Sequence, residues 1–181
     1  HIRMEYYFTD GRVIFQGKVH ARQTGKKADY LLFHAVNKPI AIVEAKDNNK
    51  PLGGGMQQAM EYAQILDIPF AYSSNGDGFL EHDFLTGNEL SLKQFPTPEN
   101  LYKRLIDAKQ LSGEALKIVE QPFYSDPYTY DPRYYQRIAV ERTVEAIAKG
   151  KDRVLIVMAT GTGKTITAFQ IIHRLKASGL K

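Results

Sequence analysis

Asp29, Glu44 and Lys46 combine residue types and a spacing that suit divalent-metal chemistry. Glu44 and Lys46 lie two apart in an apolar, β-branched segment, so both side chains leave the same face of the expected strand. Asp29 begins the preceding expected strand, and tight pairing of the two strands brings it beside Glu44. Two neighbouring carboxylates repel each other and are costly to desolvate, a penalty that a hard ion such as Mg²⁺ removes. Such an ion stabilises charge developing on a phosphodiester and lowers the pKa of bound water, and Lys46 would orient or deprotonate that water.

A second polar pair lies on the expected helix that follows. Gln58 and Tyr62 are four residues apart, so they share one helix face and would project an amide and a phenol toward the sheet or a DNA backbone. Each pattern also has an ordinary structural interpretation. Glu44 and Lys46 could be a solvated pair at a strand end, and Tyr62 could be a core residue with Gln58 at the surface. The placement of Glu44 and Lys46 at the end of the most buried strand, with an acid upstream, favours a site.

Near the other end, a glycine-rich turn reads Gly161-Thr162-Gly163-Lys164-Thr165. It follows the apolar segment 154–158, expected to be a short buried strand, and precedes an expected helix, which is the context of a phosphate-binding loop. Backbone N–H groups of the turn and of the helix start would cradle phosphates. Lys164 would reach the β- and γ-phosphates, and the Thr165 hydroxyl would bind Mg²⁺.

The elements that must position these residues follow from hydrophobic periodicity and turn residues. Strands are expected at 6–8, 13–19, 28–33, 40–46, 70–73, 78–84 and 154–158, and helices at 56–66, 98–108 and 133–149 and from after Thr165 through Lys176. The dipeptide Asp10-Gly11 favours a hairpin turn between the first two strands. The sequence therefore predicts an α/β fold in which helices pack on a mixed central sheet.

Composition excludes several other classes of protein. The 181 residues are 43% hydrophobic, which allows a packed core, and they include no Cys. A disulfide framework, a Cys-based zinc site and thiol catalysis are therefore excluded, and a reducing cytosol fits. No apolar run approaches the ~20 residues of a membrane span, so no membrane partner is expected.

Charge and proline content divide the chain. Residues 1–132 carry 14 Lys and Arg against 17 Asp and Glu, whereas residues 133–181 carry 10 against 3. The stretch 121–132 holds three prolines and no helical periodicity. We therefore expect one domain at 1–120, a linker at 121–132 and a second, incomplete domain at 133–181, whose basic balance suits phosphate-rich partners.

The acidic and polar residues resemble the PD-(D/E)xK nuclease superfamily. Asp29, the run Glu44-Ala45-Lys46, and Gln58 with Tyr62 occur in that superfamily's order, and the Gln-x-x-x-Tyr addition is typical of its motor-linked members. The resemblance implies that all five side chains are catalytic, that Asp29 and Glu44 bind the metal, and that the first domain has the PD-(D/E)xK nuclease core.

The closer resemblance is to the restriction (motor) subunit of type I restriction–modification enzymes. It is carried by three phrases: Tyr6-Tyr7-Phe8-Thr9-Asp10-Gly11, Val43-Glu44-Ala45-Lys46-Asp47-Asn48-Asn49 and Ser73-Ser74-Asn75-Gly76-Asp77-Gly78-Phe79. Met158 stands where the full phosphate-loop motif has Gly, a departure typical of helicase-type motors. Gln136 resembles the glutamine that reads the adenine edge in superfamily 2 motors.

That resemblance implies a function. Residues 133–181 would be the beginning of a RecA-like motor that binds ATP and Mg²⁺ but does not hydrolyse ATP alone. The parent protein would cleave double-stranded DNA after ATP-dependent translocation, in a complex with modification (methyltransferase) and specificity subunits. A helix usually precedes the first strand in that family, and we expect it to be either missing here or outside the given sequence.

Two alternatives remain open at the level of sequence. One is a RecB-like or type III-like nuclease–helicase of DNA processing. The other is a catalytically inert module that only docks on DNA.

Overall fold

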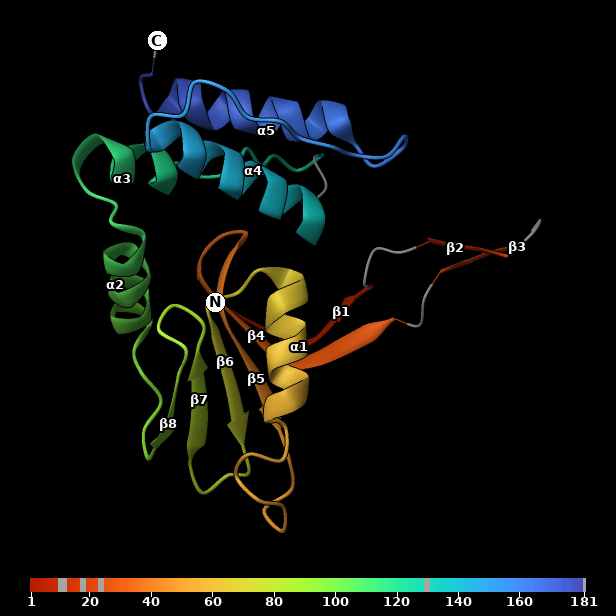
Figure 1. Ribbon diagram of the computed structural model, residues 1–181, viewed down its shortest axis with the longest axis vertical. Coiled ribbons are helices and arrows are strands. Elements are labelled where there is room, and N and C mark those ends of the chain that lie inside the picture. Colours follow the sequence, from red (N-terminus) through yellow and green to blue (C-terminus); the bar gives the residue numbers. More distant parts are fainter. Residues whose placement is uncertain (10–12, 17–18, 23–24, 129–130, 181) are drawn as a thin grey trace. The chain divides into compact units, whose positions relative to one another are not determined.

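The computed structural model describes residues 1–9, 13–16, 19–22, 25–128 and 131–180. The chain divides into two compact units, His1–Leu105 and Ile106–Lys181 (Figure 1). Among the described residues, no helix has both the length and the apolar character needed to cross a membrane. The predicted mixed α/β fold is confirmed.

The first unit is built on a six-stranded sheet with the order β1-β4-β5-β6-β7-β8. Neighbouring strands are antiparallel, except that β5 and β6 run parallel. The strands are β1 (Ile2–Phe8), β4 (Lys26–Ala35), β5 (Lys38–Ala45), β6 (Phe70–Ser74), β7 (Phe79–Asp83) and β8 (Asn88–Leu92). The parallel pair requires a crossover, and helix α1 (Met56–Leu66) provides it.

Strand β5 is the buried centre of this sheet. Its residues from Lys38 to Glu44 are all buried, as expected for a near-continuous apolar strand covered on both faces. Helix α1 lies along one face and buries Met56, Ala59, Ala63 and Leu66, which recur at helical spacing (Figure 1). Toward the other face, α2 (Pro98–Lys109) contributes Leu101 to a cluster with Val43, Phe70 and Tyr72.

The expected hairpin between residues 6–8 and a strand at 13–19 is wrong in its pairing. Strand β1 completes its ladder with β4, whereas β2 (Val13–Gln16) and β3 (Val19–Arg22) pair with each other in a separate two-stranded sheet. The expected turn at Asp10-Gly11 lies outside the described residues. Strand β8 was not expected, because it is short and mostly exposed, with only Leu90 and Leu92 as apolar residues.

The described residues of the second unit contain three complete helices: α3 (Gly113–Glu120), α4 (Tyr134–Ala148) and α5 (Lys164–Ala177). Their core contains Ile118, Phe123, Val140, Val144 and Ile171. Helix α3 was not expected from the sequence.

The expected strand at 154–158 is wrong. The structure gives this segment no strand, and Leu155 and Val157 are 88% and 86% exposed. An apolar, β-branched run has the composition of a buried strand, but a strand needs a neighbour to pair with its backbone. The described part of the second unit contains no other strand, so the segment has no sheet to join.

The stretch expected to be a linker is packed where it begins. Phe123 is only 5% exposed, and the Gln170 side chain pairs with the backbone of Tyr124. The Gln170 amide accepts from the Tyr124 N–H at 2.8 Å and donates to its carbonyl at 3.0 Å. Residues 121–124 are thus part of the second unit, whose first residue is Ile106.

Candidate functional sites

The pairing of β4 with β5 brings Asp29 and Glu44 together. Tyr30 lies opposite Val43 in this antiparallel register, which places the two acids side by side. The Asp29 Oδ2 accepts from the Ala45 N–H at 2.9 Å, and the Glu44 Oε1 accepts from the Asp29 N–H at 3.4 Å. Each carboxylate is therefore held by the other's strand.

Glu44 is buried in an environment that disfavours its charge. Its side chain is fully buried, and its Oε2 atom has no hydrogen-bond partner. The pKa of Glu44 is raised to about 7, first because burial removes the carboxylate from water and second because the charge of Asp29 is adjacent. The Lys46 ammonium, 3.6 Å from Oε2, opposes this shift.

A carboxylate oxygen without a hydrogen bond, beside a second carboxylate, is a donor set that a hard cation binds. Asp29 and Glu44 fit such an ion. Among the residues that the structure describes, no group of three or more His, Cys, Asp or Glu side chains adds to this pair.

Helix α1 brings the other two predicted residues to the same place. The Lys46 Nζ donates to the Gln58 Oε1 at 3.3 Å, and the Gln58 Nε2 donates to the Tyr62 hydroxyl at 3.3 Å. The Tyr62 ring packs edge-on against Phe8, with 5.1 Å between ring centroids. All five residues predicted from the sequence therefore form one connected set.

Two further residues of this set were not expected. Ser73 on β6 lies opposite Glu44 in the parallel register and is fully buried. Its Oγ accepts from the N–H of Gly55, the residue just before α1, at 3.0 Å. Gly55 is the last of three consecutive glycines before α1, a run that is visible in the sequence. Its closeness to Glu44 arises only in the folded structure.

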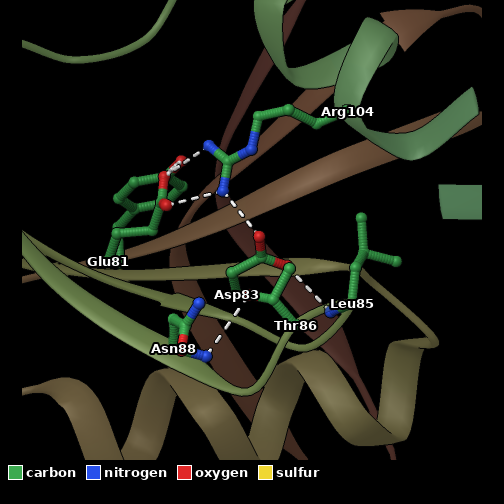
Figure 2. Close-up of polar contacts among 7 residues, drawn as sticks. Glu81, Asp83, Leu85, Thr86, Asn88 and Arg104 are labelled. Atoms are coloured by element: carbon green, nitrogen blue, oxygen red, sulfur yellow. Dashed lines mark hydrogen bonds and ion pairs between the residues drawn. The ribbon is translucent and has the colours of Figure 1, made fainter. Parts of the chain in front are cut away.

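A second acidic pair in the first unit has a different character. Glu81 and Asp83 on β7 are buried, but the Arg104 guanidinium from α2 binds both of them (Figure 2). Its nitrogens lie 2.7 and 3.0 Å from the two Glu81 carboxylate oxygens and 2.7 Å from the Asp83 Oδ2. The Tyr72 hydroxyl also donates to Glu81. This pair has its cation built in, so it is not a candidate metal site.

In the second unit, the glycine-rich turn leads directly into α5. Gly161 and Gly163 have φ values of 78° and 84°, in the left-handed region that favours glycine. The Lys164 ammonium folds over the turn and donates to the carbonyls of Met158 and Ala159 at 3.3 and 3.1 Å. Thr165 is exposed in the first turn of α5.

Gln136 on α4 holds this turn in place. Its Oε1 accepts from the Arg133 N–H at 2.9 Å, and its Nε2 donates to the Thr162 carbonyl at 2.8 Å. A methyl group on Gly163 would lie 2.3 Å from the same Nε2. Both ends of the Gln136 amide are thus used within the protein, so contact with an adenine would share or replace these bonds.

The chain is similar to the endonuclease subunits of type I restriction enzymes. A solved fragment of an HsdR subunit of a type I restriction enzyme from Vibrio vulnificus YJ016 superposes with a TM-score of 0.85. It is 49% identical, and the match covers 98% of this chain and 33% of that one. The family described as type III restriction enzyme, res subunit, matches residues 129–181.

Two curated relatives from Escherichia coli agree. The EcoAI type I endonuclease subunit is 46% identical over 96% of this chain and 22% of its own length. The EcoKI subunit of strain K12 is 29% identical over 84% of this chain and 17% of its own length. The chain spans about a fifth of the length of these relatives. It is a homologue of the endonuclease (HsdR) subunits of type I restriction enzymes.

Proposed function

We propose that this chain supplies the nuclease site and part of the ATP-binding site of a type I restriction subunit. The reaction is Mg²⁺-dependent endonucleolytic cleavage of double-stranded DNA, coupled to ATP-dependent translocation. The observation that carries the proposal is the convergence of Asp29, Glu44 and Lys46 around a buried carboxylate oxygen with no hydrogen-bond partner.

Each residue of the nuclease site has a role in this proposal. Asp29 and Glu44 would hold Mg²⁺, which would supply positive charge for the phosphodiester and lower the pKa of a bound water. Lys46 orients or deprotonates the attacking water and balances the charge of the phosphate. Gln58 directs the Lys46 ammonium through its 3.3 Å contact, and Tyr62 fixes the Gln58 amide in turn.

The second unit would bind the nucleotide. Residues 161–163 would cradle the phosphates, Lys164 would leave its carbonyl contacts to bind the β- and γ-phosphates, and Thr165 would bind Mg²⁺. Gln136 would place this turn and take the adenine-reading position. The parent protein would assemble with modification and specificity subunits. The proposal is supported by the relatives, which are named as subunits of type I restriction enzymes.

The substitution Lys46→Ala tests the nuclease proposal. In the full-length subunit, assembled with its modification and specificity subunits, we expect Lys46→Ala to abolish cleavage of plasmid DNA. Lys50→Ala is the matched control, because it removes an exposed lysine from the loop after β5. Circular dichroism would establish that both variants are folded. Wild-type cleavage by folded Lys46→Ala would refute the site.

The type III-like alternative is favoured by one observation, the family match over residues 129–181. The relatives that match nearly the whole chain are type I subunits, so we keep type I as the proposal.

A further inference from the structure

The start of α1 lies unusually close to the side chains of the nuclease site. A methyl group at Gly55 would lie 2.9 Å from the Glu44 Cβ, 3.1 Å from the Ser73 Oγ and 3.2 Å from the Lys46 Cε. The first of these separations is shorter than Cβ atoms tolerate, and it involves the stem of a fully buried residue that cannot move aside.

Backbone conformation does not explain the glycine. Gly55 has φ −103° and ψ −5°, which other residues also adopt. Glycine is needed here because a larger residue would collide with the side chains of Glu44 and Lys46, which are proposed to act on DNA.

Ser73 holds Gly55 at this distance. Its Oγ accepts from the Gly55 N–H at 3.0 Å in a buried position, and its own backbone lies opposite Glu44 in the β5–β6 register. One side chain therefore ties the helix start to the strand that neighbours the Glu44 strand.

The consequence reaches Lys46 through the helix. Gln58 follows Gly55 by three residues, within the first turn of α1, and contacts the Lys46 Nζ. Because a helix moves as a unit, displacing its start by a fraction of an ångström moves Gln58 relative to Lys46 and Glu44.

We propose that Gly55 and Ser73 are positioning residues of the nuclease site, setting the distance between the start of α1 and the Glu44–Lys46 pair. This inference rests on the proposed nuclease function. Neither residue is proposed to contact DNA or metal. Each acts by fixing the positions of the Glu44, Lys46 and Gln58 side chains relative to one another.

Two matched pairs of variants in the full-length, assembled enzyme test the inference. Gly55→Ala is compared with Gly53→Ala, whose methyl would meet only the Leu80 Cδ2. Ser73→Ala is compared with Ser74→Ala, which removes a buried hydroxyl that bonds the Gly78 carbonyl instead.

At saturating DNA and Mg²⁺, we expect the cleavage rate constant to fall by about 10- to 100-fold in Gly55→Ala and Ser73→Ala. The DNA concentration for half-maximal rate and the DNA-stimulated ATPase stay unchanged. Gly53→Ala and Ser74→Ala stay close to the wild type. A second readout needs no activity: in the metal-free protein, Ser73→Ala speeds hydrogen exchange of the Gly55 amide, and Ser74→Ala does not.

Three results would overturn the inference. They are wild-type cleavage by Gly55→Ala, equal losses in all four variants, and unchanged Gly55 exchange in Ser73→Ala. If Gly55→Ala does not fold, Ser73→Ala decides by the same two readouts. Cleavage by Lys46→Ala would instead refute the proposed function itself, so the two failures are distinguishable.

Discussion

At the scale of single residues, the first unit has two acidic pairs, and their surroundings indicate a structural role for one pair and a chemical role for the other. Glu81 and Asp83 are both ion-paired with Arg104 from the same unit. Glu44 has a neighbouring acid, a lysine at 3.6 Å and an oxygen without a hydrogen bond. Burying charge without full compensation is costly, and such groups cluster at functional sites.

The raised pKa of Glu44 makes stability depend on pH in the metal-free protein. Because the folded-state pKa of about 7 exceeds the ordinary value of 4.5, the folded state holds this proton more tightly. The resulting stabilisation is fully present below about pH 4.5 and is lost as pH rises through about 7. At ~1.4 kcal/mol per pKa unit, the loss is on the order of 3 kcal/mol.

We therefore expect the free energy of unfolding of the wild type, relative to Glu44→Gln, to fall between pH 5 and pH 8. Urea unfolding in a chelator at several pH values measures this difference. The glutamine variant is the reference because it cannot titrate at this position. Parallel pH profiles for the two proteins would contradict the buried, raised-pKa carboxylate.

The sequence could predict that the five polar residues proposed for the nuclease site share their faces, because each lies on a strand or helix whose period fixes the face it leaves. Gly55 and Ser73 could not be predicted in this way. Their role arises from the register between β5 and β6 and from the approach of a helix to that pair, and no local spacing encodes either.

At the scale of elements, prediction succeeded where burial has a clear period. Helix α1 has the expected bounds, Met56–Leu66, because small and apolar residues recur along its buried face. Prediction failed where tertiary context decides. The exposed polar strand β8 forms at the sheet edge, and the apolar segment 154–158 lacks a partner strand among the described residues.

Helix α2 is anchored to the sheet by one side chain, Arg104. The Arg104 guanidinium binds both Glu81 and Asp83 and lies 4.4 Å from the centroid of the Phe70 ring. The hydrogen bonds to Glu81, and then to Asp83, raise the pKa of Arg104, although partial burial opposes this, so the guanidinium stays charged.

We expect Arg104→Met to lower the free energy of unfolding by about 3 kcal/mol, because it leaves two buried carboxylates without a cation. Arg104→Lys should cause a smaller loss, since an ammonium keeps the positive charge but cannot bind both carboxylates with the paired N–H groups of a guanidinium. Urea titration of both variants measures the loss. An Arg104→Met midpoint equal to that of the wild type would show that the network contributes nothing to holding α2.

At the scale of the whole molecule, the two units carry different candidate chemistry, and basic charge is concentrated in residues 133–181 of the second unit. Residues 133–181 hold 10 Lys and Arg against 3 Asp and Glu, together with the phosphate-type turn. Residues 1–132 hold the paired carboxylates and a small negative excess. From the sequence, domains are expected at 1–120 and 133–181, whereas the structure divides into His1–Leu105 and Ile106–Lys181, with Phe123 and Tyr124 packed into the second unit.

The central claim is that one site cuts DNA and the other powers the step that precedes cutting. Its most direct test measures plasmid cleavage and DNA-stimulated ATP hydrolysis in parallel, for Asp29→Ala and Lys164→Ala in the assembled enzyme. Asp29→Ala removes a metal ligand, so cleavage should be lost while ATP hydrolysis continues. Lys164→Ala removes the charge proposed to hold the β- and γ-phosphates, so both activities should be lost. Normal cleavage by Lys164→Ala, or by Asp29→Ala, would contradict the account.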